Sequence, residues 1–144
     1  KEDPFVAVGT AGGTMLLYNL TLPRGKIGTR PATTEVRLAL ATRVEPERDE
    51  TGAPVGVVAL DTYMRGRKAM LAIGDATGAV RLLFRNGTQR ANIQAGDAAI
   101  GAMERGGANN AWLAVAVVGH GLVHLPCDPN TSPSSNCSCF PSAR

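Results

Sequence analysis

The stretch LAIGDATGAVRLLFRNGT, residues 71–88, decides the fold because it contains two short apolar strands and two turns. Leu, Ile, Val and Phe are residues that strands favour, and the intervening GDATG carries the Gly and Asp of a tight turn. The pair Asn86-Gly87 supplies residues that adopt φ > 0, as a two-residue type I′ hairpin requires. We therefore expect an antiparallel sheet in which Asn86-Gly87 links the third and fourth strands of one unit.

The same pattern occurs twice more, as VAVGTAGGTMLLYNLT at residues 6–21 and LAVAVVGHGLVHL at residues 113–125. When the copies are aligned on the small residue that ends the first strand, Gly9, Gly74 and Ala116 are equivalent. The second and third copies lie 42 residues apart, and four-stranded propeller blades repeat at about 40–45 residues. The first offset is longer, and its surplus falls between residues 22 and 56, where Pro, Gly and charged residues indicate surface loops.

The remaining strands are predicted from their place in the repeat. Residues 55–63 are expected to form the innermost strand of one blade, followed by the basic turn MRGRK, residues 64–68, and residues 90–94 its outer strand. Residues 98–103 then begin the next blade. Residues 35–43 suit the outer strand of the first blade. The predicted fold class is all-β, with antiparallel four-stranded blades of a β-propeller and about three blades or parts of blades present.

Over residues 4–126 the chain resembles the propeller repeat families: WD40-like, YVTN-like and FG-GAP-type repeats. Tyr18-Asn19 and Phe84-Arg85 hold the places where a WD40 unit has Trp-Asp, and GDATG offers only Asp75 where a calcium-binding FG-GAP loop has several carboxylates. The resemblance therefore implies architecture and no ligand residues. We expect residues 1–126 to be an incomplete propeller segment and the remainder of a larger propeller to complete it.

The cellular compartment is predicted from N-glycosylation sequons. Four Asn residues head an Asn-x-Ser/Thr sequence, the acceptor for N-linked glycans. The first two fall at almost the same place in the repeat, in the predicted turn after the third strand. We expect a protein that is secreted or in the secretory-pathway lumen, although Asn and Thr are also ordinary turn residues. The four acceptors are Asn19, Asn86, Asn130 and Asn136.

Cysteine usage points to the same compartment. All three cysteines lie in the Cys/Pro/Ser-rich tail, residues 127–144, whose composition cannot form an apolar core. In an oxidising compartment Cys127 can bridge to Cys137 or Cys139, which leaves one thiol for another partner. The tail is either an extension or the start of a small disulfide module. The alternative is a set of free cytosolic thiols.

No catalytic, cofactor-binding or metal-binding residues are predicted. The sequence has no G-x-S-x-G elbow, phosphate-binding Gly-rich loop or H-E-x-x-H motif. The net charge of +3 is scattered, and the basic turn at residues 64–68 is interpreted as an exposed hairpin, so no nucleic-acid partner is expected. No apolar run has the length of a membrane span.

We therefore predict a non-enzymatic glycosylated β-propeller module that serves as a protein- or glycan-interaction scaffold in an extracellular or secretory-pathway assembly. Its partners are other protein chains or glycans, bound on loops such as residues 22–34 and 44–54. One alternative is part of a propeller enzyme whose active site lies mostly in blades outside this segment. Another is a structural glycoprotein of an extracellular filament or matrix.

Overall fold

The computed structural model describes residues 4–22, 35–65, 68–106 and 112–126, and the regular structure within them is all β-strand. The strands form three antiparallel sheets. Their bounds are β1 (Phe5–Gly9), β2 (Met15–Thr21), β3 (Arg37–Val44), β4 (Val57–Arg65), β5 (Lys68–Asp75), β6 (Ala79–Phe84), β7 (Gln89–Gln94), β8 (Ile100–Gly106), β9 (Trp112–Val117) and β10 (Gly121–Pro126).

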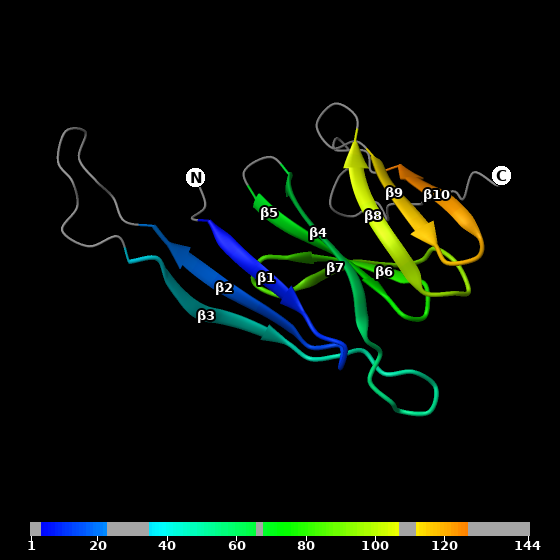
Figure 1. The fold of residues 1–144 in the computed structure, drawn as a ribbon, viewed down its shortest axis with the longest axis horizontal. Coiled ribbons are helices and arrows are strands. Elements are labelled where there is room, and N and C mark those ends of the chain that lie inside the picture. The colour runs from blue at the N-terminus through cyan, green and yellow to red at the C-terminus, as the bar shows by residue number, and fades with distance from the viewer. Residues whose placement is uncertain (1–3, 23–34, 66–67, 107–111, 127–144) are drawn as a thin grey trace.

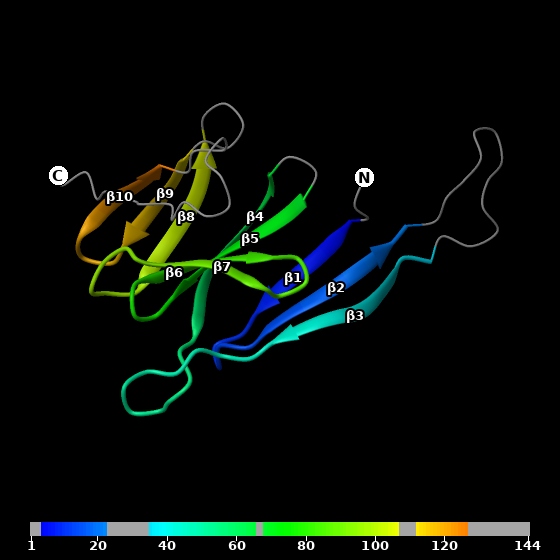
Figure 2. The same ribbon diagram turned by 180° about the vertical axis from the view of Figure 1, so that it is seen from behind.

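The central sheet is a four-stranded blade with the order β4-β5-β6-β7. The β1-β2-β3 sheet lies against one of its faces and the β10-β9-β8 sheet against the other, as Figures 1 and 2 show from opposite sides. By the repeat alignment, β1 to β3 correspond to the outer three strands of the central blade, and β8 to β10 to its inner three. Strands β4 and β8 are neighbours across the blade boundary. The predicted all-β blade architecture is confirmed.

The core is divided into two apolar layers, one on each face of the central blade. Strand β5 contributes to both, because successive side chains of a strand point to opposite faces. Leu71 and Ile73 pack toward Met15 and Leu17 of the β1–β3 sheet. Ala72 packs toward the β8–β10 sheet. This double burial explains why β5 reads as a continuous apolar run rather than an alternating one.

Glycines let adjacent blades approach closely at both boundaries. A Cβ built on Gly9 would lie 2.5 Å from Cγ1 of Val57, and one built on Gly74 would lie 2.6 Å from Cγ2 of Ile100. These two glycines are equivalent in the repeat, and both receiving contacts come from the β-branched residue at the start of the next blade's inner strand. The repeat therefore specifies a close contact between adjacent blades as well as the strand pattern.

The predicted strand order is confirmed, but the start of the inner strand is wrong by two residues. Strand β4 begins at Val57 rather than at Val55. The N–H of Val55 instead donates to the carbonyl of Glu47 at 2.8 Å, and Arg48 pairs with Pro54 in an isolated bridge. The loop before β4 thus forms a small hairpin of its own. Val55, which the sequence assigns to the strand, belongs to this hairpin instead.

Candidate functional site

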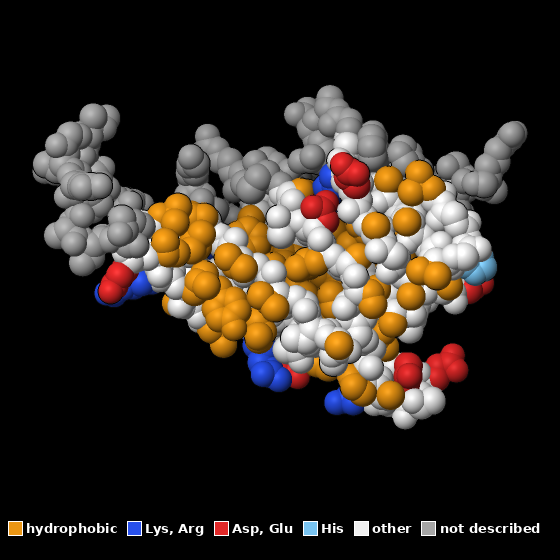
Figure 3. All heavy atoms as spheres, viewed as in Figure 1, with side chains coloured by type: hydrophobic (Ala, Val, Ile, Leu, Met, Phe, Trp, Pro, Cys, Tyr) orange, Lys and Arg blue, Asp and Glu red, His pale blue; other side chains and the backbone are white. Residues whose placement is uncertain are grey.

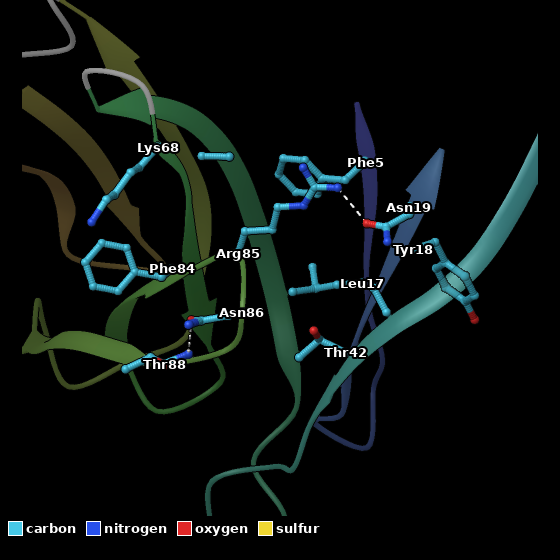
Figure 4. A pocket seen from close by; sticks show the side chains of 12 residues that line it. Phe5, Leu17, Tyr18, Asn19, Thr42, Lys68, Phe84, Arg85, Asn86 and Thr88 are labelled. Atoms are coloured by element: carbon cyan, nitrogen blue, oxygen red, sulfur yellow. Dashed lines mark hydrogen bonds between the residues drawn. The ribbon is translucent and has the colours of Figure 1, made fainter. Parts of the chain in front are cut away.

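A groove of about 590 Å³ lies between the β1–β3 sheet and the central blade, at the end of the blade where β6 turns into β7. Three aromatic residues, two cations and two residues with side-chain amides line it. Figure 4 shows Arg85 reaching across the groove to Phe5 and Asn19, while Tyr18 points away from it. The lining consists of Phe5, Leu17, Tyr18, Asn19, Ala41, Thr42, Lys68, Ala69, Phe84, Arg85, Asn86 and Thr88.

Each cation of the groove lies over an aromatic ring. The Lys68 ammonium is 5.4 Å from the centre of the Phe84 ring, and the Arg85 guanidinium is 5.0 Å from the centre of the Phe5 ring. A cation within about 6 Å of a ring face is attracted to its negative face. Nη2 of Arg85 also donates to Oδ1 of Asn19 at 2.6 Å. Arg85 therefore joins the two blades at this end of their boundary.

The turn that carries Arg85 differs from the two-residue type I′ turn that the sequence predicts. The N–H of Phe84 donates to the carbonyl of Thr88, and the N–H of Gly87 donates to the carbonyl of Phe84, both at 2.9 Å. Residues 85–87 thus form a three-residue loop, with Gly87 at φ +85°. That geometry is a type I turn followed by a left-handed residue. The predicted place of the turn, between the third and fourth strands, is confirmed.

The first two sequon asparagines line this groove from opposite sides. Asn86 lies in the β6–β7 turn, as expected, and its Oδ1 accepts from the N–H of Thr88 at 3.0 Å. The prediction of a turn position for Asn19 is wrong: it lies inside β2, paired with Phe5 and Ala39, because the strand continues beyond Tyr18. Both asparagines are exposed.

The other candidate residues that the sequence singles out lie outside the described part of the chain. These are the sequon asparagines Asn130 and Asn136, and the disulfide candidates Cys127, Cys137 and Cys139. The tail boundary at residue 127 is likewise a prediction from composition.

At the opposite end of the same blade boundary, two turns with the same set of hydrogen bonds hold carboxylates in structural roles. DETGA, residues 49–53, and DATGA, residues 75–79, each use Oδ1 of Asp to accept from the N–H and hydroxyl of Thr and from the N–H of the final Ala. The Gly of each turn has positive φ. At Asp49 the hydrogen bond from the Thr51 hydroxyl is the main reason that the carboxyl pKa is lowered. These carboxylates therefore shape turns, as predicted for Asp75.

Arg81 anchors the loop before β4 onto the central blade. Its side chain is only 2% exposed, and Nη1 donates to Oε1 of Glu47 at 3.3 Å. Because an unpaired buried charge is costly, this ion pair holds the loop against β6. In the part of the chain that the structure describes, no group of three or more His, Cys, Asp or Glu side chains is placed to hold a metal ion. The described residues also contain no helix long and apolar enough to cross a membrane.

Comparisons with known proteins agree on architecture. No protein-family model and no curated protein sequence matches the chain. Solved WD40 propellers do match in structure. The C-terminal WD40 domain of Sif2 superposes with a TM-score of 0.59 at 13% identity, over 86% of this chain and 30% of that one. The β-propeller domain of Myceliophteria thermophila Cps50 (Swd1) gives 0.61 at 9% identity, over 92% of this chain and 38% of that one.

The chain is therefore a β-propeller repeat protein, similar in fold to the solved WD40 propellers. It spans about a third of the length of the two propeller chains named above. At these identities the likeness establishes the fold, and activity does not follow from it.

Sequence reasoning found the turn and the asparagines of the groove but not its cations and rings. Lys68 belongs to the basic cluster that was interpreted as an exposed hairpin. Arg85 stands where a WD40 repeat has Asp, and that departure was the available signal. Phe5 could not be placed, because only the packing of two blades brings it beneath Arg85.

Proposed function

We propose that this chain is a non-enzymatic, glycosylated β-propeller module that acts as an interaction scaffold in an extracellular or secretory-pathway assembly. The observation that carries the proposal is the groove between two blades. It is lined by two cations, Lys68 and Arg85, that each lie over an aromatic ring, and by the two sequon asparagines. A concave site with apolar walls and a few convergent polar groups is the usual form of a binding site. The sequence also carries no G-x-S-x-G, phosphate-binding Gly-rich loop or H-E-x-x-H motif, which supports the scaffold over the enzyme.

The partner of the groove is an extended acidic peptide segment with an aromatic side chain. Lys68 and Arg85 supply positive charge, and Phe5 and Phe84 supply ring surface within the same groove. Carboxylates of the partner pair with the cations, while its aromatic ring packs against the apolar wall. Phe5, Lys68 and Phe84 lie on strands, and Arg85 in the adjoining turn is held by its contacts with Asn19 and the Phe5 ring, so little ordering cost is added on binding.

The sequons place glycans on the same groove. Asn86 is presented at a hairpin turn and Asn19 on the exposed part of β2, so both side chains are open to solvent. A glycan on either residue covers part of the groove lining. Glycosylation therefore competes with peptide binding at this end of the blade boundary.

Glycosylation is tested by expressing the chain in a secreting eukaryotic cell and measuring its intact mass. We expect one glycan fewer for Asn86→Gln and for Asn19→Gln than for the unmodified sequence. Thr88→Ala, which removes the sequon but keeps Asn86, should match Asn86→Gln. An unmodified mass for the secreted chain would contradict the glycosylated form of the proposal.

Peptide binding is tested with unglycosylated chain and a labelled short peptide in which Glu residues flank a Trp. Lys68→Glu and Arg85→Glu should each weaken binding about tenfold, because a charge attraction becomes a repulsion. Arg37→Glu is the matched control, since it makes the same change of net charge at an exposed site on β3. An equal loss for Arg37→Glu would show only attraction by net charge and would reject the groove as the site.

A further inference from the structure

Asn19 and Arg85 occupy the same place in successive repeats. Tyr18-Asn19 and Phe84-Arg85 each stand where a WD40 unit has Trp-Asp. Nη2 of Arg85 donates to Oδ1 of Asn19 at 2.6 Å, so the two equivalent positions contact each other across the blade boundary. The contact is asymmetric, because one repeat supplies a cation and the other supplies a neutral acceptor.

The side chain of Asn19 lies on the face of β2 that is turned toward the central blade. Leu17, on the same face, packs in the apolar layer between the β1–β3 sheet and the central blade. The opposite face of the sheet carries Val6 and Leu40, which are exposed, and Figure 3 shows apolar side chains gathered over this sheet. Asn19 is thus a polar residue on the inward face, and it meets the central blade at Arg85.

Phe5 and Asn19 together contact the Arg85 guanidinium in two ways. The two residues are directly paired in the β1–β2 register, so their side chains lie beside each other on the inward face. The guanidinium carbon lies over the Phe5 ring, 5.0 Å from its centre, while an N–H of the same group donates to Asn19. Figure 4 shows both contacts. The ring and the acceptor restrain different motions of the guanidinium, so both are needed to fix its orientation.

The neutral charge of Asn19 matters for the groove. A long Arg side chain on a turn samples many rotamers, and ordering it on binding costs affinity. The contacts with Phe5 and Asn19 order Arg85 when the chain folds, before any ligand binds. An Asp at position 19, the residue type that a WD40 unit has there, would neutralise the guanidinium. Asn holds the cation without cancelling its charge.

We propose that Asn19 is a positioning residue, which holds Arg85 over the Phe5 ring in the orientation that binds a carboxylate of the partner peptide. The inference rests on the proposed function of the groove. It gives Asn19 a role in the unglycosylated chain, in addition to that of a glycan acceptor.

The first test is NMR spectroscopy of the Arg85 side chain in unglycosylated chain without peptide. The ring current of Phe5 moves the resonances of protons held over its face to lower frequency, so this shift reports the position of Arg85. We expect the shift to shrink in Asn19→Ala and to persist in Asn19→Asp, which keeps an oxygen acceptor. Thr21→Ala is the matched control on the same face of β2, since it removes the sequon but keeps Asn19. Circular dichroism and thermal melting check that every variant folds.

The second test is binding of the labelled peptide in which Glu residues flank a Trp. Asn19→Ala should weaken binding about threefold, because the peptide must then order Arg85 itself. Asn19→Asp should weaken binding more than Asn19→Ala does, although Arg85 stays in place, because the new carboxylate competes with those of the peptide. Thr21→Ala should bind as the unmodified chain does. In an Arg85→Ala background, Asn19→Ala should have no further effect.

The outcomes separate this inference from the proposed function. Absence of peptide binding by the unmodified chain would contradict the proposed function, and the positioning role in binding with it. Binding by the unmodified chain that is unchanged in Asn19→Ala would overturn the positioning role alone, as would an Arg85 ring-current shift that is unchanged in that variant. An equal loss of affinity in the Arg85→Ala background would also overturn it, because Asn19 would then act on the peptide independently of Arg85.

Discussion

The central blade and the β1–β3 sheet carry the same strand pattern but have different neighbours. The central blade is packed on both faces, whereas the β1–β3 sheet has one face in the core and one exposed. Val8 and Ile73 are equivalent in the repeat, yet only Ile73 is buried. The comparison teaches that a repeat specifies which residues can form a core, while the adjacent blade decides which of them do.

The largest expected effect is on the free energy of unfolding when equivalent core positions are truncated. Ile73→Ala removes a side chain that is 1% exposed and should cost about 3 kcal/mol, since it loses burial and leaves a cavity. Val8→Ala, at a side chain that is 41% exposed, should cost under about 1 kcal/mol in the monomer. Urea denaturation in dilute solution measures both. Equal losses of unfolding free energy in the two variants would contradict the claim that burial by an adjacent blade distinguishes these positions.

The next effect concerns the glycine contact at the first boundary. Gly9→Ala places a Cβ against Val57 and should cost about 1–3 kcal/mol through overpacking. Val57→Ala removes the nearest carbon, so the double variant should recover part of that loss as a favourable coupling. Gly12→Ala is the control one turn away, where the nearest atom lies 3.9 Å from the added Cβ. Additive effects of the two substitutions would refute the contact.

A third effect is the difference in stability loss between the two turns that share a set of hydrogen bonds. Asp75 is 3% exposed, so Asp75→Ala should cost about 1–3 kcal/mol because buried backbone donors lose their acceptor. Asp49 makes the same set of hydrogen bonds at an exposed site, where water replaces the lost acceptor, so we expect Asp49→Ala to cost less. Thermal melting of the two variants shows which substitution costs more stability. The reverse order would mean that the loop hairpin contributes more than burial indicates.

The smallest effect is the pH response of Asp49. Its pKa is lowered in the folded chain, so its contribution to stability is present above the unfolded value of about 4 and is lost as pH falls through the folded pKa. Thr51→Ala removes the hydroxyl donor and should raise the pKa toward its ordinary value. Carboxyl NMR titration measures the change. An unchanged Asp49 titration in this variant would reject the Thr51 hydroxyl as the cause.

The fold was largely predictable from sequence because propeller strands carry local signals. Period-two alternation, short apolar runs and Gly-containing turns located the strands, and the repeat interval assigned them to blades. The details that failed depend on hydrogen bonds between segments. Val55 pairs with Glu47 rather than extending β4, and Asn19 continues β2 because Phe5 and Ala39 flank it.

The groove was only partly predictable, for a related reason. Asn19 and Asn86 were recognisable as sequons, but their shared groove arises from packing between residues far apart in sequence. The bond from Arg85 to Asn19 spans 66 positions, and no periodicity within either strand encodes it. The one local indication was Arg85, a basic residue at the place where a WD40 repeat has Asp.

Native-state hydrogen exchange in dilute solution tests most directly the claim that adjacent blades determine burial. We predict that the amides of β5 and β6 exchange most slowly, because these strands are paired on both edges and covered on both faces. The amides of β3, an edge strand with exposed Leu38 and Leu40, should exchange much faster. Exchange in β3 as slow as in β5 would contradict the account, because the β1–β3 sheet would then be as protected as the central blade.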